Sequence, residues 1–284
     1  MRYDDQARFD PSPLGGRGAR PSPALALGGG AGAIVVIVIA LLFGVDPGQV
    51  LRGGATGAGT ARPSPSASCT PGADVQRDRD CRFVALTSSL REYWSGARPD
   101  YREVHLATFE GRASTGCGTA SSEVGPFYCP ADTTVHLELG FLDQLGASGG
   151  DAAEAYVLAH AVGHHVQHLT GALQRVQAGG PGSGPRSPGL RLELQADCYA
   201  GVWFSHAASD PDDGLAEVSR DDLDRALDTA AAVGADRVQR RAAGQVQAES
   251  WAHGSPTERR RWLQRGVETG DPARCDTFAA DALR

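Results

Sequence analysis

Lysine is missing from the 284-residue sequence, so arginine supplies all 27 of its basic side chains. We interpret this absence as a bias in genomic base composition that has no functional meaning. A basic excess is missing as well, because 34 aspartate and glutamate residues give a formal net charge of −7. Nucleic-acid-binding proteins need a basic face for the phosphates, which argues against nucleic acid as the main partner. No Cys-x-x-Cys spacing occurs either, which argues against a zinc site built from cysteine thiolates.

Charged residues are absent from residues 24–45, ALALGGGAGAIVVIVIALLFGV. An apolar run of about 20 residues is long enough to cross a bilayer as a helix, so we expect a transmembrane anchor here. A cleaved signal peptide is the alternative, although the residues after Phe43 do not offer a convincing small-x-small cleavage site. Arginine is more frequent before this run than just after it. The positive-inside rule therefore predicts a single-pass protein of the cell membrane, with a cytoplasmic N-terminus and an extracytoplasmic C-terminal domain.

The anchor divides the sequence into four parts. Residues 1–23 are rich in proline, glycine and arginine without hydrophobic periodicity, so we expect a disordered cytoplasmic tail. The anchor itself covers residues 24–45, and the glycine-, serine- and proline-rich residues 46–73 are typical of a flexible linker. The folded domain is then expected over residues 74–284.

All six cysteines follow the apolar run, on the side that the charge rule exports: Cys69, Cys81, Cys117, Cys129, Cys198 and Cys275. An even number of cysteines in that environment indicates disulfides. The spacing from 69 to 81 equals that from 117 to 129, so we expect two local loops. That leaves Cys198 to pair with Cys275, which would tie the C-terminal region to the centre of the domain. The alternative is that some of the six are free buried thiols.

The remaining patterns indicate a mostly helical α+β domain with a small sheet. Residues 103–111 and 133–141 alternate apolar and polar side chains as strands do. The second strand could be an edge to which an extended peptide adds, or an ordinary member of the sheet. Three further helices are expected over residues 82–95, over residues 221–233 and from Ser255 onward.

Two histidines one helical turn apart are the first candidate metal ligands. Residues 149–171, GGDAAEAYVLAHAVGHHVQHLTG, are expected to form a helix that ends at Gly171. His160 and His164 are four positions apart, so both imidazoles would lie on one helix face and could bind one ion. Gly163 costs about 1 kcal/mol in a helix interior, which indicates that another element approaches closely there. Such a histidine pair also occurs by chance, so a metal site requires a third ligand.

A second, capped helix is expected over residues 187–206. Glu193 and Asp197 fall within its apolar stripe, where a carboxylate is costly to bury without a partner. A metal ion and its histidines would be suitable partners. We therefore expect Glu193 to be the third ligand of one zinc ion, and Asp197 to accept a hydrogen bond from a ligating imidazole. The alternative is that these carboxylates pair with arginines, such as Arg237 or Arg240.

Three protein ligands and an open fourth position form the catalytic type of zinc site rather than the structural type. His168, one turn beyond His164, is an alternative ligand on the same helix face. His165 points away from that face, so we expect it to pack against the domain or to lie on the surface.

With these residues in place, the sequence resembles a known family, the neutral zinc metallopeptidases, which are membrane-anchored bacterial proteins with an H-E-x-G-H-H helix. The resemblance implies a zincin-like metallopeptidase domain that is α+β and mostly α, with a small sheet and an active-site helix, preceded by one transmembrane helix. It also implies zinc as the cofactor, ligands at His160, His164 and Glu193, and a peptide or protein as substrate or ligand. Besides the apolar run, four blocks carry the resemblance: GCGTASSEVGPFYCPAD (116–132), AYVLAHAVGHHVQ (155–167), RLELQADCYAGVW (191–203) and HGSPTERRRWLQRGVETGDPARCDTF (253–278).

Ala161 stands where the family has glutamate. In an H-E-x-x-H site, zinc polarises the scissile carbonyl and makes a water molecule easier to deprotonate, while the glutamate carries the proton to the leaving nitrogen. Alanine cannot carry a proton, but it does not remove a zinc ligand. Since a general acid–base group contributes about 10²–10⁴ in rate, we expect zinc binding to be retained and peptide hydrolysis to be lost or severely reduced.

No other residue is a certain replacement for the missing base. Glu154 is expected to cap the start of the histidine helix, and nothing in the sequence places Glu123 or Glu138 near the metal. His253 could donate a hydrogen bond to the oxyanion, or it could be a surface histidine. Ala161 fits either a natural pseudopeptidase that still binds peptides or an inactivated variant of an active enzyme.

Three functions therefore remain open. The first is a membrane-anchored, extracytoplasmic zinc metallopeptidase homologue that binds zinc but is inactive or severely impaired in peptide hydrolysis. The second is an active zinc metallopeptidase that uses another base. The third is a metal-free interaction module that keeps the fold.

Overall fold

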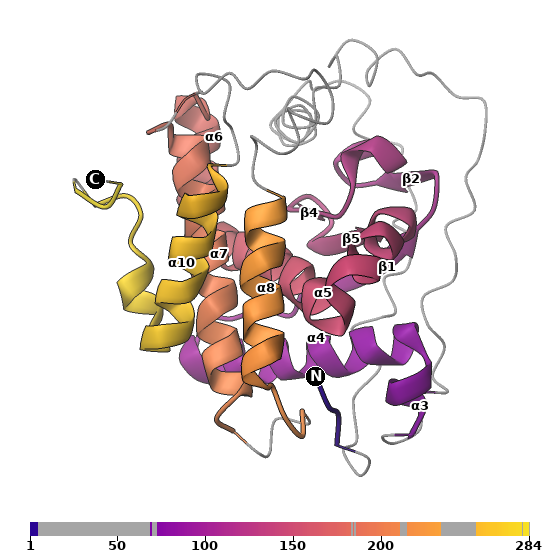
Figure 1. The fold of residues 1–284 in the computed structure, drawn as a ribbon. Coiled ribbons are helices and arrows are strands. Elements are labelled where there is room, and N and C mark those ends of the chain that lie inside the picture. The colour runs from indigo at the N-terminus through magenta and orange to yellow at the C-terminus, as the bar shows by residue number, and fades with distance from the viewer. Residues whose placement is uncertain are drawn as a thin grey trace.

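The computed structural model describes residues 1–4, 69, 73–182, 184, 186–210, 215–233, 254–279 and 281–283. Over these residues the protein is a mostly helical α+β structure with two small sheets (Figure 1). The expected transmembrane anchor, residues 24–45, lies outside this set, and so does almost all of the expected linker, residues 46–73. Among the helices that are described, none combines the length and the apolar character that crossing a membrane requires.

Each helix that the sequence patterns predict for the folded domain has a counterpart in the structure. The ends differ from the expected ones by a few residues, since helix termini depend on local caps. The helices are α3 (Ala73–Arg77), α4 (Arg79–Ala97), α5 (Leu139–Leu169), α6 (Ala172–Gly179), α7 (Pro188–Ala207), α8 (Arg220–Ala232) and α10 (Pro256–Thr269), with two 3₁₀ turns, η2 (Ser122–Val124) and η4 (Pro272–Cys275). The strands are β1 (His105–Phe109), β2 (Arg112–Thr115), β3 (Gly118–Ser121), β4 (Phe127–Cys129) and β5 (Thr134–Glu138).

Serine side chains start three of these helices. Ser187 accepts a hydrogen bond from the backbone N–H of Leu190 at the start of α7. Capping boxes start the other two, and the expected one between Ser255 and Glu258 is present in α10. These contacts satisfy backbone N–H groups that have no partner within the first helical turn.

The main sheet has the strand order β1-β5-β4, with β1 parallel and β4 antiparallel to β5. Residues 133–141 therefore do not form an edge strand, because β5 has a neighbour on each side. All five residues of β5 are buried, so the alternation in the sequence does not separate a buried face from an exposed one. The strand ends at Glu138, whose side chain accepts a hydrogen bond from Phe141 N and thereby starts α5. Strands β2 and β3 form a separate antiparallel hairpin.

Helix α5 is interrupted once. Gly150 has non-helical angles (φ 61°, ψ −155°), so the histidine-bearing part begins at Asp151, within two residues of the start of the helix expected over residues 149–171. Gly171, with φ 73°, follows the end of the helix in the left-handed conformation that glycine adopts without strain. The expected capping role of Glu154 is replaced by an ion pair, because its Oε1 lies 2.8 Å from Arg79 Nη2 on α4.

Helix α10 packs against both α7 and α8, and α5 packs against α7, α8 and strand β5 (Figure 1). Helix α7 is buried along most of its length. Its Gly201 faces Gly266 of α10 so closely that a Cβ on either glycine would lie 2.1 Å from a carbonyl oxygen of the opposite helix. This contact between glycines brings the backbone of α10 directly against the helix that carries Glu193 and Asp197.

Three disulfides are present, and they are the three expected pairs. Cys69 bonds to Cys81, Cys117 to Cys129, and Cys198 to Cys275. All six cysteines belong to the described residues, and none of them is a free thiol. The pair of Cys198 and Cys275 joins α7 to η4, so the C-terminal region is tied to the central helix.

Residues 1–4 pack against the domain, which differs from the expectation of a disordered tail for this part of residues 1–23. The backbone of Arg2 pairs with that of Glu217, with Arg2 N 2.9 Å from Glu217 O. Tyr3 is only 3% exposed within the hydrophobic core. The amino group of Met1 lies 2.7 Å from Asp222 Oδ1 at the start of α8.

Candidate metal centre

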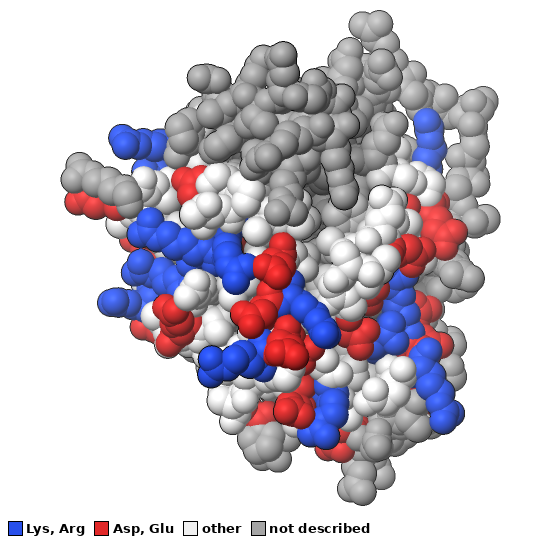
Figure 2. Space-filling view, in the orientation of Figure 1, with Lys and Arg blue, Asp and Glu red and all other residues white. Residues whose placement is uncertain are grey.

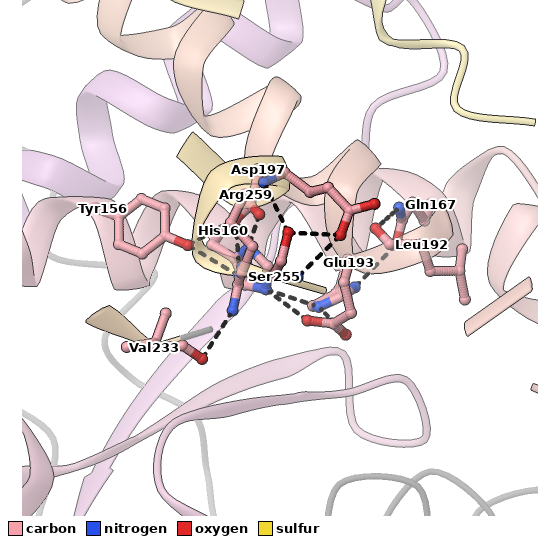
Figure 3. Close-up of polar contacts among 11 residues, drawn as sticks. Tyr156, His160, Gln167, Leu192, Glu193, Asp197, Val233, Ser255 and Arg259 are labelled. Atoms are coloured by element: carbon pink, nitrogen blue, oxygen red, sulfur yellow. Dashed lines mark hydrogen bonds and ion pairs between the residues drawn. The ribbon is translucent and has the colours of Figure 1, made fainter. Parts of the chain in front are cut away.

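The three expected ligand side chains meet between α5 and α7. His160 Nε2 lies 3.1 Å from His164 Nε2. One carboxylate oxygen of Glu193 lies 3.4 Å from His160 Nε2, and the other lies 3.5 Å from His164 Nε2. The three side chains are between 13% and 19% exposed, so the group is largely sheltered from solvent. Figure 3 shows His160 and Glu193 facing each other in this arrangement.

These distances agree with tetrahedral zinc coordination. Two ligand atoms that each lie about 2.0–2.2 Å from zinc, at the tetrahedral angle, are about 3.3–3.6 Å apart. The three separations of 3.1, 3.4 and 3.5 Å lie in or just below that range. The donor set of two imidazole nitrogens and one carboxylate also matches the chemistry that zinc prefers. The residues therefore fit a zinc ion with three protein ligands.

Hydrogen bonds to the far sides of the rings fix which imidazole nitrogens carry protons. His160 Nδ1 lies 2.8 Å from Asp197 Oδ1, which can only accept, and 3.3 Å from Arg259 Nη2, which can only donate, so the shorter contact assigns the proton to Nδ1. His164 Nδ1 lies 2.9 Å from Gln167 Oε1. Each neutral ring therefore has its proton on Nδ1 and a lone pair on Nε2. Two lone pairs and a carboxylate converge on one point, and a cation bound there would stabilise this arrangement.

Asp197 is completely buried and has three partners. Tyr156 donates its hydroxyl hydrogen to Oδ1 over 2.6 Å, and Arg259 donates from Nε to Oδ2 over 2.8 Å (Figure 3). Burial alone would raise the pKa of Asp197, but the Arg259 guanidinium and the His160 ring hold that pKa below its ordinary value. Asp197 is thus a carboxylate that accepts a hydrogen bond from His160 and orients its ring. The sequence predicts this contact for Asp197.

The two ring environments shift the imidazole pKa values in opposite directions. Burial disfavours the charged form of both rings. At His164 burial prevails, and the pKa lies below its ordinary value. At His160 the neighbouring Asp197 and Glu193 carboxylates outweigh burial, and the pKa lies above its ordinary value.

Gly163 explains how α5 and α7 approach each other closely beside the candidate ligands. A Cβ on Gly163 would lie 3.0 Å from both Cα and O of Ala196. The expectation that another element lies against this glycine is confirmed, and that element is α7. Any larger residue at position 163 would push Glu193, three positions before Ala196, away from the histidines.

Two partners of the ligand shell were not anticipated from the sequence. Arg259, on α10, is the arginine that pairs with Asp197, whereas Arg237 and Arg240 lie outside the described residues. The metal hypothesis and the arginine hypothesis are therefore not exclusive, because Asp197 contacts both His160 and Arg259. Gln167 could have been found, since it lies one turn beyond His164 on the same helix. Arg259 had no local signal, because its position depends on the packing of α10.

The other sequence candidates have different surroundings. His168 Nδ1 lies 2.7 Å from Tyr128 OH, and His165 Nδ1 lies 3.0 Å from the same hydroxyl, so both histidines pack toward the sheet. Ala161 is 4% exposed on α5. His253 lies outside the described residues, and the side chain of Glu123 does as well.

A second group of metal-ligand residue types lies at the strands, where Cys129, Asp132 and His136 come together. Cys129 is bonded to Cys117, so it has no thiolate to offer a metal. Asp132 instead accepts hydrogen bonds from Gly116 N and approaches His136 Nε2. This group is therefore a structural contact between the hairpin loop and β5.

Figure 2 shows one face of the described part of the molecule. Arginines and acidic side chains are interspersed there, so the face is not uniformly basic.

Comparison with known proteins finds relatives over most of the chain. The family model described as "Putative neutral zinc metallopeptidase" matches residues 4–278. The uncharacterized protein Rv2575 of Mycobacterium tuberculosis (strain ATCC 25618 / H37Rv) is 45% identical over 255 residues, which cover 86% of each chain. The uncharacterized protein YpfJ of Escherichia coli (strain K12) is 38% identical over 235 residues, which cover 78% of this chain and 80% of the relative. No solved structure matches the chain.

Proposed function

The chain belongs to the neutral zinc metallopeptidase family, and from this premise we propose that it binds one zinc ion but is inactive or severely impaired in peptide hydrolysis. The observation that supports this most is the meeting of His160 Nε2, His164 Nε2 and the Glu193 carboxylate within 3.5 Å of one another. Ala161 directly follows the first of these ligands and brings only a methyl group.

A zinc peptidase site needs residues that bind the metal and a residue that transfers a proton. His160, His164 and Glu193 would hold the ion, while Asp197 fixes the His160 ring through its Nδ1–H. Zinc bound there would supply Lewis acidity, which polarises a peptide carbonyl and makes a water molecule easier to deprotonate. The remaining step, transfer of a proton to the leaving nitrogen, needs a side chain that Ala161 cannot provide.

The carboxylates that could replace the missing base have other partners in the described part of the chain. Glu138 is 3% exposed and caps α5 through Phe141 N. Glu154 pairs with Arg79, and Asp197 is held by three hydrogen-bond partners. These engagements favour an impaired site over an active site with an alternative base.

A paired assay of the full-length protein tests this function. The parent protein and the Ala161→Glu variant are compared for zinc content and for hydrolysis of a mixture of quenched fluorescent peptides. We expect about one zinc per chain in both and a rate that is about 10²–10⁴ higher in Ala161→Glu. The double variant Ala161→Glu/His164→Ala is the control, and we expect it to lose both the metal and the activity.

Each outcome separates the three hypotheses. Equal turnover by the parent and Ala161→Glu, abolished in both by His164→Ala, would show an active peptidase with another base. A folded parent protein without stoichiometric zinc would instead favour the metal-free interaction module.

We also propose a zincin-like architecture for residues 74–284 and attachment to the cell membrane through residues 24–45. A helix that carries two ligands, a second helix that carries the third and a small sheet beside them support the architecture. Three disulfides support an oxidising, extracytoplasmic location for the domain. Membrane fractionation of the parent, compared with a variant that lacks residues 24–45, tests the anchor. The partner that we propose for the site is a peptide or a protein.

A further inference from the structure

A chain of buried amides leads from His164 to the C-terminal region. His164 Nδ1 lies 2.9 Å from Gln167 Oε1. Gln167 Nε2 lies 3.2 Å from Gln195 Oε1 on α7, and Gln195 Nε2 lies 3.0 Å from the carbonyl oxygen of Cys275. Gln167 is fully buried and Gln195 is 7% exposed. The metal ligand is therefore connected through two side chains to η4.

Two backbone carbonyls fix the direction of this chain. Gln167 Nε2 also lies 2.7 Å from the carbonyl oxygen of Leu192, which can only accept a hydrogen bond (Figure 3). The amide nitrogen of Gln167 must therefore point to α7, and its oxygen must point to His164. Gln195 obeys the same rule, because its nitrogen faces the carbonyl of Cys275. A flip of either amide would set two acceptors or two donors against each other.

The fixed direction determines the state of the metal ligand. Since Gln167 presents an oxygen, His164 must present a proton on Nδ1, and its Nε2 keeps the lone pair that a metal needs. The opposite tautomer would put a proton on Nε2, toward His160 and Glu193. The same hydrogen bond also fixes the rotation of the ring about its long axis.

The anchor of the chain is covalent. Cys275, whose carbonyl ends the chain of amides, is bonded to Cys198 of α7. Cys198 lies three positions after Gln195 on the same helix, so the disulfide holds the acceptor opposite the donor. The disulfide between Cys198 and Cys275 is thus connected through Gln195 and Gln167 to His164.

We propose that Gln167 and Gln195 are positioning residues of the metal centre, and that the turn at Cys275 sets the orientation of His164 through them. The proposal rests on the zinc site proposed above. The competing explanation is that the two glutamines only join α5 to α7, in which case they would affect stability but not the metal. A buried amide without a partner is costly in either case, so stability alone cannot separate the two explanations.

Two substitutions of Gln167 distinguish the positioning role from the purely structural role. Gln167→Met removes both the acceptor for His164 and the donors to α7. Gln167→Glu keeps an acceptor for His164 Nδ1–H and removes only the donors. We measure zinc dissociation constants by competition with a chromophoric chelator, visible spectra of the cobalt-substituted protein, and thermal unfolding, all on the full-length protein. Gln264→Met is the matched control, because Gln264 is an exposed helical glutamine on α10.

We expect the zinc dissociation constant of Gln167→Met to be about 10–100-fold higher than that of the parent, and its cobalt spectrum to differ. Loss of a hydrogen-bond partner of a metal-ligating histidine typically has an effect of this size. Gln167→Glu should stay within about tenfold of the parent, although it loses the same contacts to α7. Gln195→Met should raise the constant by a smaller factor, because Leu192 O still holds Gln167. Gln264→Met should bind zinc as the parent does.

A folded Gln167→Met protein with the parent's zinc affinity and cobalt spectrum would overturn the proposal. Equal losses in Gln167→Met and Gln167→Glu would overturn it as well, because the acceptor would then be irrelevant. If Gln167→Met does not fold, Gln195→Met decides by the same measurements. A folded parent that binds no zinc refutes the metal centre itself, whereas binding by the parent with unchanged variants refutes only the positioning role.

Discussion

Arg259 donates two hydrogen bonds of 2.8 Å to the carboxylate of Asp197, from Nε to Oδ2 and from Nη2 to Oδ1. The two side chains come from different helices, α10 and α7, and both are almost completely buried. The carboxylate that orients His160, a proposed metal ligand, is therefore also the partner of a buried cation. This double role makes the pair a point where stability and metal binding are coupled.

Replacing Asp197 by asparagine should impair both properties. Asp197→Asn leaves the Arg259 cation buried without a counter-charge, which should destabilise the domain by about 3–5 kcal/mol. It also weakens the hydrogen bond to His160, which should raise the zinc dissociation constant about 10–100-fold. Denaturant unfolding with and without a chelator measures the two effects separately.

The matched control for Asp197→Asn is Asp228→Asn. Asp228 is 75% exposed and pairs with Arg260 at the surface. An exposed ion pair contributes about 0–1 kcal/mol, so this variant should unfold and bind zinc as the parent does. Similar effects of the two substitutions would contradict the role assigned to Asp197.

Gly163→Ala should separate the two helices that carry the ligands. The added Cβ would meet the backbone of Ala196 at 3.0 Å, and forcing extra volume into such a contact costs about 1–3 kcal/mol. This cost opposes the gain of about 1 kcal/mol that alanine brings to a helix interior. We expect lower thermal stability and weaker zinc binding in Gly163→Ala.

Gly96→Ala is the control for that substitution. Gly96 is also helical, but a Cβ there would meet nothing within 4 Å. The variant should gain up to about 1 kcal/mol in stability and keep the zinc affinity of the parent. A stability gain in Gly163→Ala like that in Gly96→Ala would mean that α5 and α7 are not in close contact.

Removal of the metal should lower the stability of the folded domain. A ligand that binds only the native state, at 100 times its dissociation constant, stabilises it by about 2.7 kcal/mol. Zinc should therefore raise the midpoint of thermal unfolding, and a chelator should reverse the rise. His164→Ala should abolish the response, whereas His206→Ala, which removes a partly buried histidine at the C-terminal end of α7, should preserve it. A zinc response of full size in His164→Ala would place the binding site elsewhere.

The disulfide between Cys198 and Cys275 should contribute more to stability than the disulfide between Cys117 and Cys129, because it closes a longer loop. Cys198 and Cys275 are 77 positions apart, whereas Cys117 and Cys129 are 12 apart. In the chain-entropy account, the longer loop contributes about 4.5 kcal/mol and the shorter one about 3 kcal/mol. Paired serine variants, compared by denaturant unfolding, check this order. A larger loss for the short loop would indicate that native-state contacts dominate over loop entropy.

The features that the sequence predicted correctly are local or are fixed by counting. Helix geometry alone puts His160 and His164 on one face, and Ser255 with Glu258 starts α10 as a capping box. The disulfide pairing followed from two equal spacings. The close approach at Gly163 was predicted because a glycine in a helix interior requires a reason.

The features that the sequence did not predict depend on which elements become neighbours. Residues 139–141 continue the alternation of β5, but Glu138 caps a helix there, so the strand is shorter than the pattern. The central place of β5 depends on β1 and β4, which a single strand pattern does not reveal. Arg259 reaches Asp197 only because Gly201 and Gly266 allow α10 to touch α7.

The packing of the first residues has a consequence for how the chain could meet a bilayer. Tyr3 and Cys69 both lie against the same domain. If that domain lies on one side of a membrane, both ends of the intervening sequence, which includes the apolar run, lie on that same side. One passage of that run through a membrane would carry Tyr3 to the far side and expose its ring. Exposure of this ring would lower the free energy of unfolding of the domain by about 1.5–3 kcal/mol. Docking of the extreme N-terminus on the domain and a single membrane passage of residues 24–45 therefore exclude each other.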